Sequence, residues 1–365
     1  MIFLITPAET NGGILQFSVT FANELSKLKE CILFIPKTSE PFLPANTEFN
    51  FRFYNKIKSL NSKNSEIKKL CKHIAELKPE HVIFLEDSIL MQQMCCILSE
   101  YKIPSSVVIH DIVHHPSSKM TLRQKAVEYL RIKLSKKTVN KAKNIILLSE
   151  NSRSAFVKLY PRIKAKPIVF KLGAHVPVKE FKKPPEMNDN PLKYFLFFGR
   201  IDKYKGIESL CKAYSGLDES IQNENKLIIA GKGNFSQQEK TIIEKNKNIL
   251  IIHRFIEDSE MLWLIKNSQA VVLPYIEASQ SGVIPIAYYC NRPVIVRNLH
   301  GLVESVEENK TAAVFQNEEE LKNIFQQMAC NNTLFDVKVI QDYFDENFCW
   351  NKNLKKLMEQ INVKQ

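Results

Sequence analysis

Two cationic side chains follow a strand-like run at the start of the second half of the chain. In the segment F-F-G-R-I-D-K-Y-K-G-I, Arg200 comes directly after Gly199, and Lys205 lies in the same loop. A guanidinium and an ammonium at the end of one buried strand can both reach a single dianionic group, although surface ion pairs are the alternative role. The glycine at the strand end favours the first interpretation, and we predict a phosphate site here.

Glycine or histidine follows three more strand-like runs. Gly12 and Gly13 come after the first run, His110 comes directly after the run at 107–109, and Gly231 opens the segment G-K-G after a third. Glycines let backbone N–H groups approach a phosphate closely, although such turns also serve geometry alone. A histidine at the carboxyl end of a strand favours a functional role over a place in the core.

One stretch, residues 270–296, reads as a buried strand, a polar turn and a short apolar helix that starts near Gly282. The turn carries Glu277 and Ser281, and the helix continues with Val283. Such a turn exposes backbone N–H groups at the positive end of a helix, which suits a phosphate or a sugar hydroxyl. An ordinary strand–helix–strand crossover is the other interpretation.

Short apolar runs alternate with amphipathic segments throughout the chain. This alternation predicts parallel, doubly wound sheets in an α/β protein. The strand-like runs are residues 2–5, 31–35, 82–85, 107–109, 145–148 and 168–170 in the first half, and 194–198, 226–230, 249–252, 270–273 and 294–296 in the second.

A proline-rich segment at 177–191 interrupts the alternation, and this break predicts two domains joined by an extended linker. The expected organisation is therefore two Rossmann-like domains that face each other across a ligand-binding cleft. Their bounds are residues 1–176, a linker at 177–192, a C-terminal domain at 193–340, and a terminal helix within 341–365.

The formal net charge of +12 is concentrated in one region, residues 119–143, which holds a single acid, Glu128. Its apolar positions approximate one helical face. This pattern suits either an amphipathic helix on an anionic membrane surface or the solvated face of an ordinary packed helix. No interleaved aromatic residues or nucleic-acid motif accompany the charge, so we expect no nucleic-acid partner. No apolar run approaches the ~20 residues of a membrane span.

The eight cysteines include no C-x-x-C pair and mostly lie in apolar surroundings, so we interpret them as reduced core residues of a cytoplasmic protein. The opening M-I-F-L-I-T-P lacks a basic n-region and is interpreted as a first strand rather than a signal peptide. No G-x-G-x-x-G follows this strand, which argues against an NAD-type dehydrogenase.

These landmarks, in this order, resemble the family 4 retaining glycosyltransferases, which have the GT-B fold. The resemblance covers nearly the whole chain. It rests on the glycine pair Gly12-Gly13, on His110-Asp111, and on the segments I-I-L-L-S-E-N-S, F-F-G-R-I-D-K-Y-K-G, L-I-I-A-G-K-G, V-V-L-P-Y and P-V-I-V-R-N-L-H-G-L-V-E.

The resemblance implies transfer of a sugar from a nucleotide-diphosphate-sugar, UDP- or GDP-linked, with retained anomeric configuration and no further cofactor. Arg200 and Lys205 would neutralise the departing diphosphate, helped by backbone N–H groups around Gly13 and Ser281–Val283. His110 would contact the transferred sugar from the N-terminal domain. No D-x-D triplet occurs in the chain, so we expect no metal at the site.

The chain departs from the family where two glutamates separated by seven residues are usual. Alignment on Gly282 places Ser279 at the first of these positions and Ala287 at the second. Glu277 lies two residues before the first position and is the remaining candidate to reach the sugar. Glu304, in H-G-L-V-E, has a family counterpart at the edge of the cleft.

We therefore expect an active transferase that acts on a cell-surface polysaccharide or a lipid-linked glycan. It would be cytoplasmic and peripheral on the inner face of the membrane. The departure at Ser279 and Ala287 keeps a second hypothesis open, a GT-B-like binding or scaffold subunit without catalysis. The resemblance also implies that the C-terminal helix returns toward the N-terminal domain.

Overall fold

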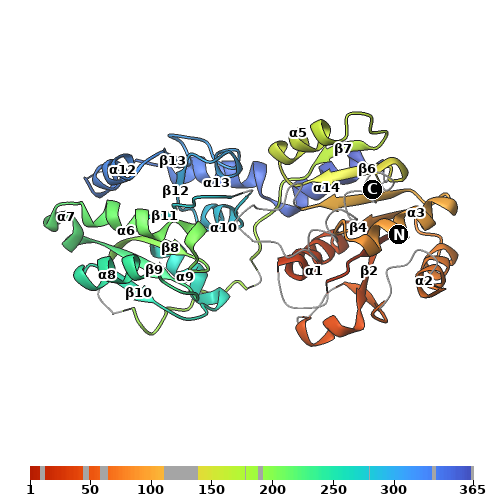
Figure 1. Cartoon of the computed structure of the whole chain (residues 1–365), viewed down its shortest axis with the longest axis horizontal. Coiled ribbons are helices and arrows are strands. Elements are labelled where there is room, and N and C mark those ends of the chain that lie inside the picture. Colours follow the sequence, from red (N-terminus) through yellow and green to blue (C-terminus); the bar gives the residue numbers. More distant parts are fainter. Residues whose placement is uncertain are drawn as a thin grey trace. The chain divides into compact units, whose positions relative to one another are not determined.

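The computed structural model describes residues 1–8, 13–43, 49–57, 65–110, 139–176, 178–187, 192–278, 280–330 and 334–362. The chain forms two compact units (Figure 1), Met1–Leu172 together with Trp350–Gln365, and Gly173–Cys349. We call them the N-terminal and C-terminal domains.

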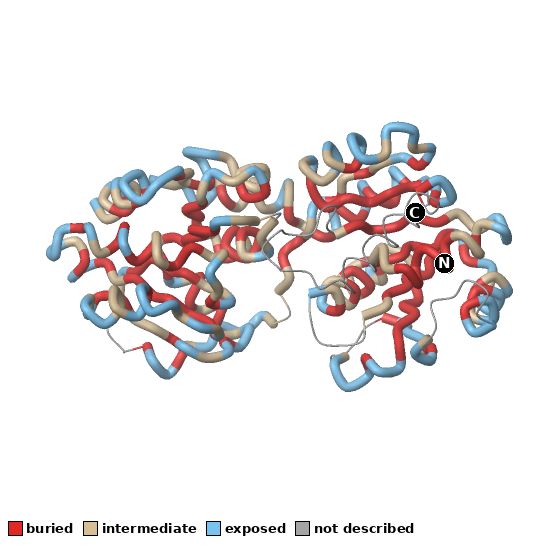
Figure 2. The backbone as a smooth tube through the Cα atoms, in the orientation of Figure 1, coloured by how far each residue is buried: buried red, intermediate tan, exposed pale blue. Residues whose placement is uncertain are grey.

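The N-terminal domain contains a parallel sheet of seven strands in the order β3-β2-β1-β4-β5-β6-β7. Most of its strands are buried along their whole length (Figure 2), as expected for a parallel sheet covered on both faces. The strands are β1 (Ile2–Ile5), β2 (Cys31–Pro36), β3 (Asn50–Tyr54), β4 (His81–Phe84), β5 (Ser105–Ile109), β6 (Asn144–Leu147) and β7 (Lys166–Val169).

Helices cover both faces of this sheet, because successive strand residues point to opposite sides. Ile2 and Leu4 of β1 belong to the core that includes α1 (Gly13–Ser26) and the last helix, α14 (Trp350–Gln360). Phe3 and Ile5 belong to the core on the other face. That face carries α2 (Ser65–Glu76), α3 (Ile89–Glu100) and α5 (Glu150–Leu159), and a 3-10 turn, η1 (Lys37–Phe42), follows β2.

The C-terminal domain contains a parallel sheet of six strands in the order β10-β9-β8-β11-β12-β13. The two sheets confirm the expected pair of doubly wound, Rossmann-like domains. The strands are β8 (Lys193–Phe198), β9 (Asn225–Ala230), β10 (Ile249–Ile252), β11 (Ala270–Leu273), β12 (Val294–Arg297) and β13 (Ala312–Phe315).

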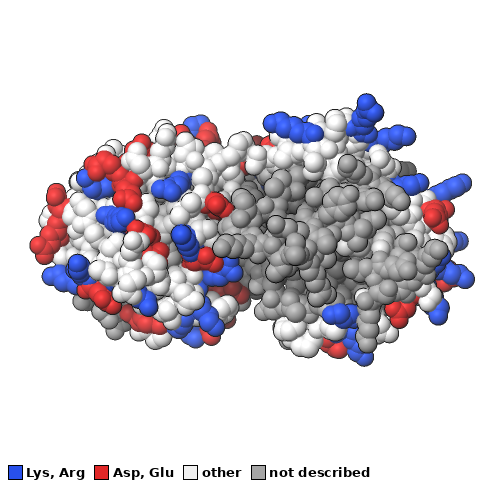
Figure 3. All heavy atoms as spheres, in the orientation of Figure 1, with Lys and Arg blue, Asp and Glu red and all other residues white. Residues whose placement is uncertain are grey.

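The helices of this domain pack in two groups, α6 against α8 and α12, and α10 against α9 and α13. On the face seen in Figure 3, acidic and basic side chains of this domain are interspersed rather than gathered in one patch. The helices are α6 (Ile207–Ser215), α7 (Glu219–Glu224), α8 (Gln237–Lys245), α9 (Asp258–Asn267), α10 (Val283–Tyr289), α11 (His300–Val303), α12 (Glu318–Cys330) and α13 (Val337–Asn347), with a 3-10 turn, η2 (Lys203–Lys205).

The segment expected as a linker at 177–192 is packed on the C-terminal domain over its described part. The Lys182 N–H donates to the Ser259 carbonyl oxygen at 3.0 Å. Arg254 Nε donates to Glu186 Oε1 at 2.7 Å. The boundary between the domains falls earlier, between Leu172 and Gly173.

The end of the chain forms two helices where a single helix within 341–365 was expected. Tyr343 and Phe348 pack against Tyr288 in the C-terminal domain, which keeps α13 there. The return to the N-terminal domain begins at Trp350, whose ring packs 5.8 Å from that of Phe170. Five of the eight free cysteines are buried, as expected of core residues, whereas Cys330 is exposed.

Candidate functional site

The centre of the C-terminal sheet, where β8 and β11 are neighbours, is the point at which the strand order reverses. The carboxyl ends of two such strands border the usual ligand site of an open α/β sheet. The loop after β8 (199–206, the β8 loop) and the loop after β11 (274–282, the β11 loop) meet there. The Ile276 N–H donates to the Tyr204 carbonyl oxygen at 2.7 Å, so the two loops are joined.

Gly206 lets the two loops approach each other at the start of α6. Its φ is +69°, and a Cβ at this position would lie 2.0 Å from the Pro274 carbonyl oxygen. Any side chain would therefore clash with backbone as well as strain the dihedral. The position of Lys205, one residue earlier, depends on this close contact.

Lys205 is a half-buried cation at the centre of the site. Its ammonium lies 3.5 Å from the centroid of the Tyr275 ring and 5.0 Å from that of Tyr204. Burial and the positive charge of Arg200 lower the pKa of Lys205 to about 8, against an opposing effect of Asp202. A partly desolvated cation on an aromatic face attracts an anion more strongly than a solvated lysine does.

Arg200 stands at the open side of the same loop. Its side chain is 67% exposed, with Nη2 3.4 Å from Asp202 Oδ2 and the guanidinium 5.8 Å from the Tyr204 ring centroid. Its charge contributes to the lowered pKa of Lys205, so the two cations repel each other. A dianion bound by both would relieve that repulsion, and the structure brings together the two residues predicted to bind it.

The glycines of the site fall into two kinds. Gly199 has a φ of +136° and no atom within 4 Å of where a Cβ would be, so there is open space beside Arg200. At Gly231 a Cβ would lie 1.8 Å from the Gly199 carbonyl oxygen, and at Gly233 one would lie 2.0 Å from that of Ile201. Close contact between the loops after β8 and β9 therefore explains Gly231 without a ligand.

Few side chains cover the end of the β11 loop, where α10 begins. Gly282 is exposed, and a Cβ added there would have no atom within 4 Å. Ser281 Oγ lies 3.4 Å from the Tyr275 hydroxyl and accepts a long hydrogen bond, also 3.4 Å, from the Val283 N–H. This N–H, expected to face the ligand, thus has a partner within the loop. Glu277 is half-buried, and Ser279 lies outside the described residues.

Two further predicted positions flank this loop. Ala287 is fully buried in α10 and offers no carboxylate. Glu304 directly follows α11 after the neighbouring strand β12, and its Oε2 lies 3.7 Å from His300 Nδ1. Glu304 thus lies at the same carboxyl edge of the sheet as the two loops.

Tyr204 and Tyr275 are the functional candidates that the sequence alone does not distinguish. Each lies in a segment that carries the resemblance to the family, but the contact that matters joins two loops far apart in the chain. The sequence does contain a partial signal. Tyr275 comes just after the buried strand β11, and Lys205 lies in the loop that follows another buried strand, β8. Burial raises the pKa of Tyr275 to about 12, so its hydroxyl stays protonated beside Ser281.

The N-terminal domain places His110 directly after β5. Its Nε2 lies 2.9 Å from the Leu85 carbonyl oxygen, and its ring packs edge-on against Phe17 at 4.9 Å. Phe17 lies on α1, which begins at Gly13, where a Cβ would meet open space. Gly12 lies outside the described residues.

The basic segment at 119–143 is described only from residue 139 onward. There Val139 and Ala142 are buried in the core of the N-terminal domain, so at this end the apolar face packs on protein. Within the described part of the chain, no three His, Cys, Asp or Glu side chains are grouped as metal ligands would be. No helix among those same residues is long and apolar enough to cross a membrane.

Residues 178–333 match the family model described as glycosyl transferases group 1. An uncharacterized glycosyltransferase of Methanocaldococcus jannaschii is 24% identical over 236 residues, which cover 61% of this chain and 59% of that protein. The match thus spans little more than half the length of the relative.

Solved structures share the fold over the whole chain. Anabaena HepE in complex with UDP is 15% identical with a TM-score of 0.76, and each chain is covered completely. HepE has also been solved with UDP-glucose, with a TM-score of 0.71 to this chain. Sucrose-phosphate synthase of Thermosynechococcus elongatus is 15% identical with a TM-score of 0.68, covering 99% of both chains. The C-terminal domain therefore resembles the glycosyl transferases group 1, and the two Rossmann-like domains of the chain have the GT-B fold.

Proposed function

We propose that the protein transfers a hexose from a nucleotide-diphosphate-sugar, UDP- or GDP-linked, to an acceptor hydroxyl, with retention of anomeric configuration. One observation carries the proposal. Lys205 is held against Tyr275 with Arg200 beside it, at the point where the strand order reverses in a domain that matches the group 1 family model. This arrangement supports binding of a diphosphate by two cations.

In the proposed reaction, the bond between the anomeric carbon and the diphosphate oxygen breaks, and the acceptor oxygen bonds to the same face of the sugar. The acceptor proton passes to the departing diphosphate oxygen. Lys205 and Arg200 stabilise the negative charge that develops on this leaving group, which is usually the largest catalytic contribution at such sites. Two fixed cations provide this charge compensation in the place of a metal ion.

The sugar end of the donor would lie along the β11 loop. Gly199 and Gly282 leave open space on the two joined loops, and Glu277 is the predicted carboxylate that lies within the β11 loop itself. His110, held by the Leu85 carbonyl oxygen and Phe17, is proposed to contact the transferred sugar. Glu304 would lie at the edge of the donor site.

The acceptor is proposed to be a growing cell-surface polysaccharide or a lipid-linked glycan. Such acceptors are presented at the cytoplasmic face of a membrane, and the basic segment at 119–143 would attract its anionic lipids. The enzyme would then be cytoplasmic and peripheral. Binding to vesicles that contain anionic lipid, but not to neutral ones, is the expected result.

Donor turnover in the wild type and three single variants tests the proposal. Arg200→Ala and Lys205→Ala remove the proposed phosphate contacts, whereas Lys203→Ala removes an exposed lysine of the same loop. Slow hydrolysis of UDP-glucose or GDP-mannose, followed by release of nucleotide diphosphate, should fall about 100-fold or more in the first two variants and stay unchanged in the third. Unchanged turnover in all three would refute the phosphate site. The configuration of the released or transferred sugar, read by NMR, tests retention.

The scaffold hypothesis retains one supporting observation, since Ala287 is buried and contributes no carboxylate to the site. A noncatalytic subunit would bind the nucleotide weakly or fail to bind it, and would show no turnover with any donor. A thermal-shift screen against UDP, GDP, ADP and CMP distinguishes the two, because a ligand at 100 times its Kd stabilises a fold by about 2.7 kcal/mol.

A further inference from the structure

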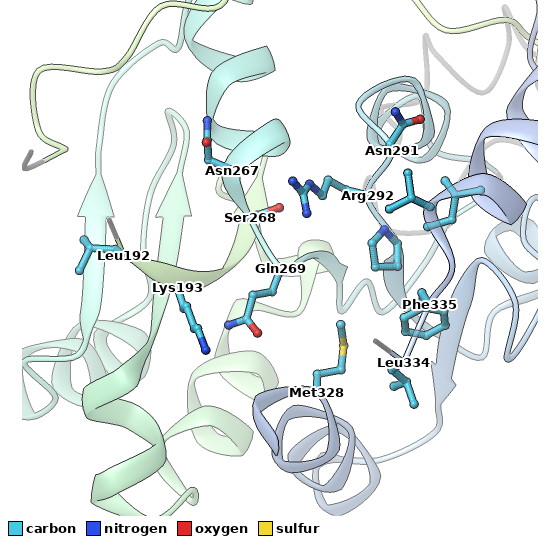
Figure 4. Close-up of a pocket in the computed structure, with 13 residues that line it drawn as sticks. Leu192, Lys193, Asn267, Ser268, Gln269, Asn291, Arg292, Met328, Leu334 and Phe335 are labelled. Carbon is cyan, nitrogen blue, oxygen red and sulfur yellow. The ribbon is translucent and has the colours of Figure 1, made fainter. Parts of the chain in front are cut away.

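A cavity lies at the opposite edge of the C-terminal sheet from the candidate donor site. It has a volume of about 290 Å³ and opens beside the amino ends of β8, β11 and β12. The last turn of α12 and the start of α13 complete its wall. Figure 4 shows residues from these elements around one hollow.

The polar side of the cavity is positively charged. Lys193 and Arg292 line it, and no carboxylate is found among its lining residues. Arg292 Nε donates to the Lys266 carbonyl oxygen at 2.7 Å, which fixes the guanidinium. Within the described part of the chain, neither its Nη atoms nor the Lys193 ammonium has a hydrogen-bond or ion-pair partner. Burial lowers the pKa of the Arg292 guanidinium, so an anion would relieve an unfavourable charge.

The other side of the cavity is apolar. Met328, Leu334 and Phe335 lie across from Lys193 and Gln269 in Figure 4. A ligand that fills the space would thus contact hydrocarbon at one end and a fixed guanidinium at the other. The volume lies near the lower end of the range for small-molecule pockets.

Asn291, another residue that lines the cavity, carries an unsatisfied acceptor. Its φ of 58° and the hydrogen bond from its N–H to the Tyr288 carbonyl oxygen make it the left-handed residue that ends α10. Its side-chain Oδ1 is buried and has no hydrogen-bond partner among the described residues. Buried acceptors are normally paired, so a ligand that reaches this one should carry a donor, such as the hydroxyl of a singly protonated phosphate.

We propose that this cavity is a binding site for a small organic anion, a phosphate or carboxylate attached to an apolar group of about aryl size. The guanidinium of Arg292 binds the anionic group with both Nη atoms, Lys193 adds charge at the mouth, and Met328 and Phe335 cover the apolar group. The site is separate from the donor site and does not depend on the function proposed above.

Calorimetric titration of the full-length protein with phenyl phosphate tests the site. Saturable binding is expected in the wild type and in Lys205→Ala, which disables the candidate donor site. Arg292→Gln keeps a donor for the Lys266 carbonyl oxygen and should weaken binding about tenfold or more, since charge-assisted bidentate bonds are lost. Lys193→Met should weaken it severalfold, while Lys245→Met, an exposed lysine outside the cavity, should leave it unchanged.

Two comparisons of ligands test the two sides of the cavity. Benzyl alcohol lacks the charge and inorganic phosphate lacks the ring, so both should bind at least about tenfold more weakly than phenyl phosphate. The proposal is overturned if either compound binds the wild type as tightly as phenyl phosphate does. It is also overturned if phenyl phosphate itself shows no saturable binding. If binding is lost in Lys205→Ala but unchanged in Lys193→Met, the anion binds at the donor site instead. If Arg292→Gln does not fold, Lys193→Met and the cavity-filling Leu334→Trp, which should abolish binding, decide the question.

Discussion

The Lys205 ammonium lies 3.5 Å from the centroid of the Tyr275 ring, so a residue of the β8 loop is held by a residue of the β11 loop. The hydrogen bond from the Ile276 N–H to the Tyr204 carbonyl oxygen joins the same two loops. A cation fixed in this way loses water before any ligand arrives, and this loss explains its lowered pKa. The site is therefore prepared for an anion at a cost to the stability of the folded protein.

Nucleotide binding should depend on the protonation of Lys205. Because the pKa of Lys205 is lowered to about 8, the free protein loses this charge as the pH rises through about 8, and affinity for UDP should fall. Lys205→Arg stays charged and should keep its affinity to higher pH. Calorimetric titration between pH 6.5 and 9.5 measures the change. A wild-type affinity that does not vary over this range would contradict the role of Lys205.

The lowered pKa of Lys205 also affects the stability of the folded protein. Nucleotide affinity should fall as the pH rises, whereas stability should increase. The folded-state pKa of about 8 lies below the ordinary value of 10.5, so the unfolded chain binds more protons between these values. The charge of Lys205 thus costs stability at neutral pH, and the cost disappears as the pH rises toward 10.5. Lys205→Met should raise the melting temperature at pH 7 by about 2–4 °C for each kcal/mol recovered, while nucleotide binding is lost.

Much of the fold could be predicted because the strands are continuous apolar runs between turn residues. Ala270–Leu273 and Val294–Arg297, for example, lie within one residue of the expected runs. The bounds of the linker could not be predicted, because prolines predict an extended segment equally well in solvent or on a surface. The segment is attached to the C-terminal domain through the hydrogen bonds of Arg254 to Glu186, and Arg254 is far away in the sequence.

The candidate site could be predicted in part, since Arg200 and Lys205 lie in one loop and their proximity follows from the sequence. The aromatic support from Tyr275 and the structural reason for Gly231 could not, because both are contacts between loops that follow different strands. The cavity at Arg292 also escaped prediction, because its lining comes from five separate segments of the chain.

Gly206 and Gly282 should respond oppositely to alanine. Gly206→Ala forces a Cβ to 2.0 Å from the Pro274 carbonyl oxygen at a φ of +69° and should cost more than the about 1–2 kcal/mol of the dihedral alone. Gly282 has a φ of −68° and open space, so Gly282→Ala should be neutral or stabilise by about 0.4–1 kcal/mol.

Urea unfolding measures both glycine variants, and titration with UDP-glucose separates stability from function. If the β11 loop binds the donor, Gly282→Ala should weaken that binding although the protein is as stable as the wild type. Equal destabilisation by the two substitutions would show that the contrast in packing is wrong.

Arg254 should stabilise the C-terminal domain in a pH-dependent way. Its guanidinium donates to Glu186 and to the nearly buried Glu260 at 2.7–2.9 Å, and these contacts lower the pKa of both carboxyls. Lowered carboxyl pKa values give stability that is present above about pH 4.3 and is lost as the pH falls. Arg254→Met should therefore destabilise at pH 7 by about 1–3 kcal/mol, because Glu260 loses its partner, and by less at pH 3.5.

Lys310→Met is the matched control for Arg254, since it breaks an exposed pair with Glu307. It should change stability by no more than about 0.2–1 kcal/mol at either pH. A loss in Arg254→Met that is equal at pH 7 and pH 3.5 would mean that the arginine acts through packing of its stem rather than through its charge.

Trp350 should determine the stability of the N-terminal domain, although it lies at the other end of the chain. Its ring is 9% exposed and packs against Phe21 and Phe170 at 6.3 and 5.8 Å, and the next turn is fixed by the Asn353 side chain, which donates to the Lys171 carbonyl oxygen. Trp350→Ala should cost about 3–5 kcal/mol, as large-to-small substitutions in cores do, whereas Trp350→Phe keeps an aromatic ring and should cost less.

Scanning calorimetry with and without UDP separates the two domains in this experiment, because a ligand raises the transition of the domain that binds it. In Trp350→Ala the transition of the N-terminal domain should fall, while the transition raised by UDP stays where it is in the wild type. A fall confined to the UDP-sensitive transition would show that α14 stabilises the C-terminal domain instead.

Trp350 should also affect donor turnover. The Phe17 ring lies between Trp350 and His110, with its centroid 6.5 Å from that of Trp350 and 4.9 Å from that of His110, so Trp350→Ala should reduce donor turnover without weakening UDP binding. That combination is expected only if His110 acts on the sugar and α14 helps to position it.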